Sequence, residues 1–283
     1  SYNYLTYPLW GNALRKAGAK IVVSAHDVLR QKAILCRSWE DRQLAAFYYD
    51  ADAILVHSEF QAKQLEEFTS VPRNKVHLVP HGPYDYPAPV ESSAMLRKRY
   101  GVPVNACLGL FFGQLRDEKN LEGLLRALPG LDETTHLLVA GKGGGRHKPG
   151  QYYQKLASDL GVIGQVTFVD RFIEDAEVGG LFTMADWLAL PYEDTFVSQS
   201  GVLNIAGSYD LPILVGDAPV LRETVVNENI GIAAASGHLQ AGIVEMESAL
   251  RDNRQFGFQC YRDKHNWAEN ARITKEVYHS LVG

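Results

Sequence analysis

The sequence predicts an α/β protein built on parallel sheets that are flanked by helices. Short aliphatic runs alternate with amphipathic segments along the chain, and each run is apolar at consecutive positions rather than at every second one. Parallel strands that are covered on both faces have this pattern. The predicted strands are Lys20–Ser24, Ala53–His57, Val76–Pro80, Cys107–Phe112, His136–Ala140, Val166–Val169, Trp187–Leu190 and Pro212–Val215.

The segments between these runs have helical periodicity. Asn120–Leu128 places four leucines at the i, i+3, i+4, i+7 spacing of a helix that packs on one face. Ser58–Phe68 opens with a serine suited to capping, followed by Glu59. The other predicted helices are Ser38–Asp50, Gln151–Leu160, Ser200–Tyr209 and an amphipathic tail from about Tyr261 to Leu281.

A proline-rich segment divides the chain into two unequal parts. His81–Pro89 reads HGPYDYPAP, and its prolines are incompatible with the interior of a helix or sheet. We therefore expect a first domain over 1–86, with three strands, and a second over 87–262, with five. Three parallel strands make a poor independent core, so the first domain is either a remnant or has its opening strands outside this chain.

Composition excludes several classes of protein. The chain of 283 residues is 46% apolar and 22% charged, which excludes a disordered, collagen-like or repetitive polymer. Its formal net charge of −5 makes nucleic acid an unexpected main partner. No run approaches a membrane span and the uncharged start does not resemble a secretory signal, so we expect a cytoplasmic protein, with peripheral membrane contact left open.

Two further features of the composition carry expectations. Cys36, Cys107 and Cys260 are far apart, which favours reduced, mostly buried thiols over disulfides or a metal cluster. Basic clusters at 15–20 and 97–99 would suit anionic lipid, but we favour exposed, solvated charge for both.

The loop after the fourth predicted strand suits a diphosphate. It reads FFGQLRDEKN, with Gly113 at the strand end and with Arg116 and Lys119 three apart before a helix. An arginine fork and a lysine ammonium beside a helix start can neutralise a diphosphate. The alternative is a solvated loop in which the two cations pair with Asp117 and Glu118.

Two more loops follow strands of the same predicted sheet, where ligands of such sheets bind. Gly141–Gly145 reads GKGGG, which allows close approach of a ligand to the backbone but equally a flexible surface turn, and it lacks the spacing of a P-loop. Ser198–Gly201 precedes a helix, whose first amides would bind an anion. Plain capping by Ser198 or Ser200 is the alternative.

Histidines follow two strands of the first half. His26 and Asp27 come directly after the first strand and could orient a substrate or move a proton, although a lone histidine is more often structural. His81 presents the same choice. The remaining strand histidines are interpreted as packing residues: His57, His77 and His136. No histidine spacing indicates a metal site, and a nucleophile role for Ser200 is rejected because the G-x-S-x-G pattern is absent.

Taken in chain order, these segments resemble the family 4 retaining glycosyltransferases, which have the GT-B fold of two facing Rossmann-like domains. The resemblance is carried by IVVSAHDV, LFFGQLRDEKNLEGLLRAL, LLVAGKG, VTFVDRFIEDAEVGGLFTMADWLALPY and SQSGVLNIAGSYDLPILV. The tail with Trp267 and Tyr278 resembles the family's terminal helix, which crosses back to the first domain, here over 263–283. Each motif is weak alone, but their order along nearly the whole chain is specific.

The resemblance implies roles for individual residues. Arg116 and Lys119 would hold the donor diphosphate, and His26 would lie near the transferred sugar. Asp27 and His81 would lie on the acceptor side. The donor-binding set would be Gly113, Gly141, Lys142, Arg171, Phe172, Glu193, Ser200, Gly201 and Val202, with the backbone around Arg171 and Phe172 meeting the base.

The sequence departs from the family in three places. Val197 and Ile205 stand where relatives often have two glutamates, so Glu193 would replace the first in part and Asn204 or a neighbour would serve the ribose. Asp210 stands in place of a glycine. The opening half of the first domain, which relatives use for the acceptor, is not in this chain, which puts acceptor binding in question.

The resemblance implies a retaining hexosyltransferase that moves a sugar from a nucleotide-diphospho-sugar to a hydroxyl of a glycan, lipid-linked or small-molecule acceptor. It implies no cofactor and no required metal, because the cations and amides offset the charge on the leaving diphosphate. Two alternatives stay open: a sugar-nucleotide epimerase or phosphorylase on the same fold, and a non-catalytic donor-binding subunit whose partner chain completes the first domain.

Overall fold

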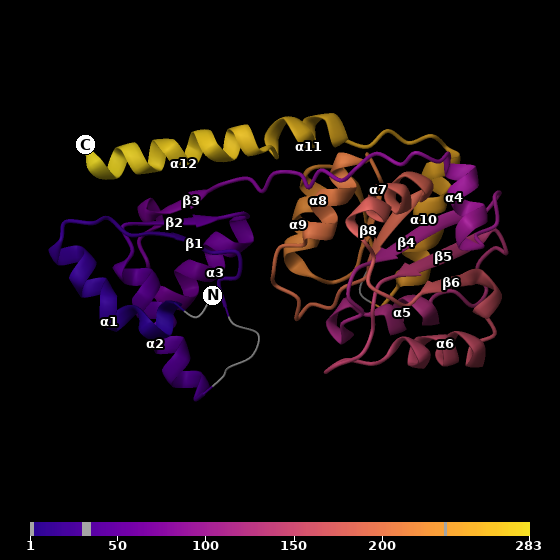
Figure 1. Ribbon diagram of the computed structural model, residues 1–283, viewed down its shortest axis with the longest axis horizontal. Helices are drawn as coiled ribbons and strands as arrows, with labels where there is room; N and C mark the ends of the chain where they lie inside the picture. Colours follow the sequence, from indigo (N-terminus) through magenta and orange to yellow (C-terminus); the bar gives the residue numbers. More distant parts are fainter. Residues whose placement is uncertain (1–2, 30–34, 235–236) are drawn as a thin grey trace. The chain divides into compact units, whose positions relative to one another are not determined.

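The computed structural model describes residues 3–29, 35–234 and 237–283. The chain forms two compact units, which are drawn with all their elements in Figure 1. Unit 1 consists of residues 1–82 and 264–283, and unit 2 consists of residues 83–263. Between β3 and α4, residues 79–89 form neither helix nor strand.

Unit 1 is a three-stranded parallel sheet in the order β1-β2-β3. In its register Val22 lies opposite Ala53, and Ile54 lies opposite Val76. The strands are β1 (Val22–Ser24), β2 (Ala53–Val56) and β3 (Val76–Leu78), and the helices are α1 (Asn3–Lys16), α2 (Arg37–Asp50), α3 (Glu59–Thr69) and α12 (Trp267–Val282).

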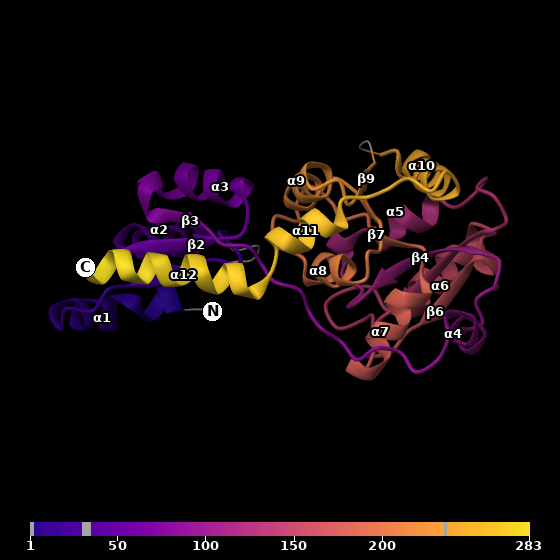
Figure 2. The same cartoon turned by 90° about the horizontal axis from the view of Figure 1, so that it is seen from above.

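Helices cover both faces of this small sheet. Ile54 and Val56 face a cluster formed with α1, α2 and α3, whereas Ala53 and Leu55 pack with Val277 of α12. Figures 1 and 2 show α12 lying along one side of the sheet, with α1 and α2 on the other. The consecutive apolar residues of β2 are therefore explained by burial on two sides.

Unit 2 is a six-stranded parallel sheet in the order β6-β5-β4-β7-β8-β9. Its strands are β4 (Cys107–Phe112), β5 (Thr135–Ala140), β6 (Val166–Val169), β7 (Trp187–Leu190), β8 (Ile213–Val215) and β9 (Gly231–Ala233). Its helices are α4 (Ser93–Tyr100), α5 (Leu121–Arg126), α6 (Gly150–Asp159), α7 (Asp175–Met184), α8 (Gly201–Ser208), α9 (Pro219–Asn227), α10 (Leu239–Arg251) and α11 (Phe258–Lys264), the last of which ends at the boundary with unit 1.

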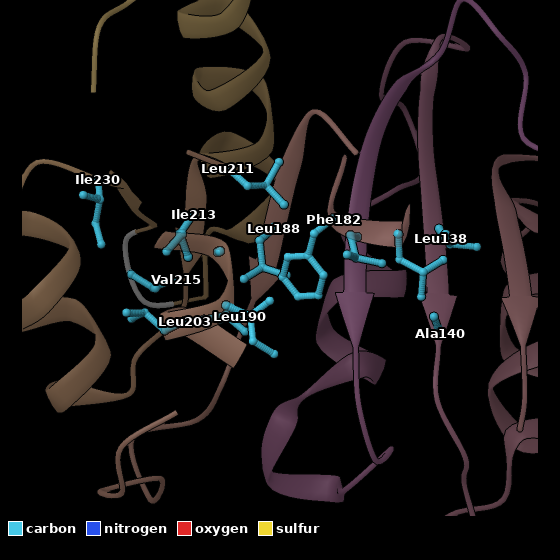
Figure 3. Close-up of a cluster of buried hydrophobic side chains, with 14 of the residues drawn as sticks. Leu138, Ala140, Phe182, Leu188, Leu190, Leu203, Leu211, Ile213, Val215 and Ile230 are labelled. Atoms are coloured by element: carbon cyan, nitrogen blue, oxygen red, sulfur yellow. The ribbon is translucent and has the colours of Figure 1, made fainter. Parts of the chain in front are cut away.

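Alternate residues of the central strands feed two cores. Leu188 and Leu190 point into a cluster with α7 and α8, part of which is shown in Figure 3. Trp187 and Ala189 point to the opposite cluster, with α5, α6 and α10. The sheet therefore has helices on both faces, so the carboxyl edge of its strands is where loops can present polar groups.

The fold class predicted from the sequence is confirmed: both sheets are parallel and flanked by helices. The prediction of five strands in the second half is wrong, because β9 is a sixth. It is three residues long and begins with Gly231, so it lacks the aliphatic run that marked the others. Among the described helices, none is both long and apolar enough to cross a membrane.

Two expectations about single residues are also wrong. Cys36 and Cys260 are exposed thiols, one at the start of α2 and one in α11, and only Cys107 is partly buried. Arg97 is not solvated surface charge, because it is 8% exposed. Its guanidinium donates to the carbonyl oxygens of Met184, Val104 and Ala106 and to the Asp186 carboxylate.

Candidate functional site

Gly113 and Lys119 meet at the carboxyl end of β4. Gly113 follows the strand with φ 96°, and its amide donates to the carbonyl of Ala140 at 2.9 Å. A Cβ placed on Gly113 would lie 3.1 Å from Nζ of Lys119 and 3.9 Å from Cγ2 of Val202 in α8. The glycine thus leaves room beside a lysine ammonium and the start of a helix.

Lys119 ends the short 3₁₀ turn of Asp117–Lys119 and is only 8% exposed. Its Nζ donates to the carbonyl of Phe112 at 3.4 Å and lies 5.5 Å from the centre of the Tyr192 ring. Burial, and next the nearby Arg116 charge, lower the pKa of Lys119 to about 8. The ammonium has lost most of its hydration and makes only a long hydrogen bond, so a bound anion would stabilise its charged form strongly.

Arg116 lies at the start of the same turn with its side chain 45% exposed. Its Nε donates to Gln114 Oε1 at 3.2 Å, and Nη1 is 3.9 Å from Glu118. Asp117 instead accepts from the amide of Lys148 and lies 3.5 Å from Nδ1 of His147. The alternative in which both cations pair with the adjacent acids therefore fits Arg116 in part and Lys119 poorly.

The glycine loop after β5 packs directly on the loop after β4. Gly141 has φ 152°, and a Cβ there would lie 1.9 Å from the carbonyl oxygen of Gly113. The carbonyl of Lys142 accepts from the amide of Leu115 at 3.1 Å, while the Lys142 side chain is exposed. A glycine at 141 is thus required by close contact between two backbones, which a flexible surface turn would not need.

The start of α8 presents main-chain amides beside Lys119. Ser200 is the N-cap residue, is 5% exposed, and its side chain makes no capping hydrogen bond within the described part of the chain. The interpretation of Ser200 as a plain cap is therefore not supported. Gly201 and Val202 begin the helix, and the first amides of a helix lack an acceptor within it.

The positions that depart from the family differ in exposure. Glu193 is exposed, and its amide donates to the carbonyl of Glu118 at 3.1 Å, which joins this loop to the loop after β4. Ile205 is buried. Asn204 is also buried, and its Oδ1 accepts from the Tyr261 hydroxyl at 2.8 Å. Oδ1 of Asn204 is thus used by α11, whereas its buried Nδ2 has no hydrogen-bond partner among the described residues, and the ribose role of Asn204 stays a prediction.

Arg171 and Phe172 follow β6 at the edge of the same sheet. Arg171 is exposed and pairs with Glu177 at 2.6 Å, and the Phe172 side chain is 66% exposed. The amide of Arg171 donates to Val169, so the backbone turns sharply out of the strand. The two residues lie on the loop where the resemblance implies a base, with an aromatic face open to solvent.

In unit 1, histidines follow each of the three strands and gather at one edge of the sheet. Nδ1 of His26 lies 2.9 Å from Nε2 of His57, whose Nδ1 lies 2.9 Å from the carbonyl oxygen of Val79. The His81 ring centre is 5.6 Å from that of His57 and 6.2 Å from that of His26. The ring centre of Trp267 in α12 lies 5.1 Å from that of His81.

This cluster changes one interpretation made from the sequence. The His26 ring is hydrogen-bonded to the His57 ring, so a second histidine orients it. The interpretation of His57 as a packing residue is therefore wrong. His136, by contrast, is buried in β5 and bonds to Thr167, as a packing residue would.

Burial shifts the titration of the pair. It lowers the pKa of His57 to about 4, with the nearby histidine charges adding to the effect. It also lowers the pKa of His26, with His81 as the second cause. Both rings are therefore neutral at neutral pH. Within the described ranges, no three His, Cys, Asp or Glu side chains gather so as to hold a metal ion, and metal independence stays a prediction.

Comparison with known proteins agrees with these features. Residues 94–274 match the family described as glycosyl transferases group 1, and residues 2–83 match glycosyltransferase family 4. This chain belongs to the family 4, group 1 glycosyltransferases. A D-inositol 3-phosphate glycosyltransferase of Xylanimonas cellulosilytica is 26% identical over 241 residues, which cover 81% of this chain and 57% of that protein.

Solved structures show the same fold at lower identity. Sucrose-phosphate synthase from Thermosynechococcus elongatus superposes with a TM-score of 0.77 at 19% identity, covering 96% of this chain and 70% of the other. Anabaena HepE in complex with UDP also gives 0.77, at 17% identity, covering 95% and 74%. The GT-B fold of the family is thus shared, while this chain spans little more than half of the curated relative above.

Proposed function

We propose that this chain carries the donor-binding machinery of a retaining, metal-independent hexosyltransferase, and that the donor is a nucleotide-diphospho-sugar. The position of Lys119 carries the proposal. Its desolvated ammonium lies beside Gly113 and Val202, where a glycine leaves space and helix amides begin. An anion that entered this space would meet a positive charge and main-chain donors together.

The residues around Lys119 suit the chemistry of a leaving diphosphate. Negative charge grows on the diphosphate as the bond to the sugar breaks, and preorganised donors stabilise that charge at little reorganisation cost. Lys119 supplies a fixed ammonium and Arg116 supplies an exposed guanidinium that can turn to the outer phosphate. The amides of Gly201 and Val202 supply the remaining donors.

We propose that the donor's own phosphate oxygen takes the proton from the acceptor hydroxyl, with His26 orienting the sugar. A depressed pKa suits His26 for accepting or orienting a hydroxyl and poorly for carrying a permanent charge. Phe172, which is open to solvent, offers a stacking face for the base. We favour UDP as the nucleotide because HepE binds UDP on the same fold.

Replacing Arg116 by Ala tests this proposal. We expect turnover of a nucleotide sugar to fall by about 100-fold or more, as when one donor to developing charge is removed, while the circular dichroism spectrum is unchanged. Arg126→Ala is the matched control, because Arg126 pairs with Glu122 on the surface of α5. Unchanged turnover in the Arg116 variant would overturn the diphosphate assignment.

A binding screen identifies the donor independently of the acceptor. UDP, GDP and ADP sugars are each mixed with the chain, and the melting temperature is measured, because a ligand that binds the folded state raises it. We expect a rise with the UDP sugar that Lys119→Met abolishes. The non-catalytic subunit would be favoured instead by two results together: the chain binds the donor without turning it over, and light scattering gives the molar mass of a complex with a second chain.

A further inference from the structure

We propose that His57 is a positioning residue, which holds His26 in one tautomer with its Nε2 as a hydrogen-bond acceptor. The inference rests on the proposed function in assigning the group that Nε2 accepts from: a hydroxyl of the bound sugar. The tautomer itself follows from contacts within unit 1 alone.

The carbonyl of Val79 decides the tautomer of His57. A carbonyl oxygen can only accept, so the nitrogen 2.9 Å from it, Nδ1 of His57, carries the proton. Burial keeps the His57 ring neutral, and a neutral imidazole has one protonated nitrogen only. Nε2 of His57 therefore presents a lone pair.

The lone pair of His57 then decides the tautomer of His26. Nδ1 of His26 lies 2.9 Å from that nitrogen, so Nδ1 must donate and carry the proton. Nε2 of His26, the far nitrogen of the ring, is left as an acceptor. It can receive a hydrogen bond from an O–H or N–H group, whereas a phosphate or carboxylate oxygen, which has no proton to give, is disfavoured there.

A buried glutamine fixes the backbone on which both rings stand. Gln61 of α3 is 0% exposed. Its Nε2 donates to the carbonyl of His26 at 2.8 Å, and its Oε1 accepts from the amide of His57 at 2.9 Å. One side chain thus ties the loop after β1 to the loop after β2, and the His57–Val79 bond ties the latter to the end of β3.

This arrangement is built for orientation. Three consecutive strands are joined at their carboxyl ends through Gln61 and His57, and each hydrogen bond in the set is between 2.8 and 2.9 Å. Because the ring is already held in one tautomer, no proton has to move between its nitrogens when a hydroxyl approaches. A carboxylate in the place of His57 would also fix the tautomer but would raise the His26 pKa and favour the charged ring.

Nitrogen NMR of the full chain, labelled with ¹⁵N in its histidines, tests the tautomer directly. Two-bond proton–nitrogen correlations distinguish protonated from unprotonated ring nitrogens. We expect His26 and His57 each to show a protonated Nδ1 and an unprotonated Nε2 at neutral pH. A proton on Nε2 of His26, or an average of both tautomers, would overturn the inference.

Two variants test the positioning role. His57→Phe removes the acceptor and keeps a ring, and we expect kcat to fall about 10-fold or more while the dissociation constant for UDP stays unchanged. His57→Gln places a carboxamide oxygen near the former Nε2, and we expect it to restore part of kcat. His77→Phe, a histidine of β3 outside the cluster, is the matched control and keeps full kcat.

The outcomes separate the inference from the proposed function. A wild-type chain that shows the expected tautomer but turns over no nucleotide sugar contradicts the function and leaves the histidine pair standing. Full kcat in His57→Phe overturns the positioning role even where the wild-type tautomer is as expected. If His57→Phe does not fold, the wild-type spectrum and His57→Gln decide the matter.

Discussion

Replacing Lys119 by Met separates two effects of the buried ammonium: its destabilisation of the folded chain and its contribution to UDP binding. Lys119 is 8% exposed, and burial lowers its pKa from 10.5 to about 8. A pKa gap of about 2.5 corresponds to about 3 kcal/mol, at about 1.4 kcal/mol for each tenfold change. Holding the charged form in the folded chain at pH 7 therefore lowers the free energy of unfolding by roughly this amount.

The expected sign follows from where the protons are bound. Below pH 8 the amine is protonated in both folded and unfolded chains, and the cost is fully present. Between about pH 8 and 10.5 the unfolded chain binds a proton that the folded chain does not, so the free energy of unfolding rises with pH. Lys119→Met removes this dependence, because methionine fills the space without a charge.

We expect Lys119→Met to raise the free energy of unfolding by about 1–3 kcal/mol at pH 7, and the gain to shrink by pH 10. The same variant should lose the UDP-induced rise in melting temperature. Urea unfolding followed by circular dichroism at both pH values measures the first effect. Lys155→Met, whose side chain is 76% exposed beside Asp159, is the control and should show neither.

The opposite result would refute the reasoning. A Lys119→Met chain that is less stable than wild type at pH 7, or whose stability difference is the same at pH 10, would mean that the ammonium is not held at a cost. Retained protection by UDP would mean that the diphosphate binds elsewhere.

Three other changes have expected results. Gly141→Ala places a Cβ 1.9 Å from the Gly113 carbonyl oxygen, so the two loops must separate; UDP affinity measured by calorimetry should fall about 10-fold or more, and unchanged affinity would contradict the close packing. Arg97→Met leaves buried carbonyls and Asp186 without their donor and should cost about 3–5 kcal/mol in urea unfolding; a loss below 1 kcal/mol would show that water replaces the guanidinium. Tyr261→Phe removes the donor to Asn204 and should cost about 1–3 kcal/mol with UDP affinity unchanged; a selective loss of affinity would instead connect Asn204 to the ligand.

Local patterns were sufficient for the parts of the fold that repeat along the chain. The central strands were predictable because burial on both faces imposes consecutive apolar residues, as in β5 and β7. The Ser58 cap was predictable because its side chain acts on the amide of Gln61, three residues away. β9 was not, because its residues are Gly231, Ile232 and Ala233, which do not form the run of large aliphatic side chains that marks β5 and β7.

The site was predictable where it depends on strand ends, and not where it depends on distant side chains. Gly113 and Gly141 each follow a strand, so their loops could be expected at one edge, and the structure brings them into contact. The bond between His26 and His57 joins residues 31 positions apart. The sequence indicates this bond only through the position of the two histidines after neighbouring strands of one sheet. The interpretation of His57 as a packing residue did not take that position into account.

Arg97 shows the same limit from another side. Its neighbours in sequence, Lys98 and Arg99, made a basic cluster that resembled solvated surface. The groups that bury it are the carbonyl of Met184 and the carboxylate of Asp186, nearly ninety positions away. A pattern of neighbouring residues cannot predict hydrogen-bond partners that lie so far away in the sequence.

Unit 1 is made of two segments that lie on either side of unit 2 in the sequence, and this affects the order in which the units fold during synthesis. One face of its sheet is covered by α12, within residues 264–283, which leave the ribosome after all of unit 2. Until α12 emerges, Ala53 and Leu55 have no layer above them, while unit 2 already has every residue of its own. We infer that nascent unit 2 folds first and that unit 1, with an apolar face of its sheet open to chaperones, completes its folding only after α12 has been synthesised.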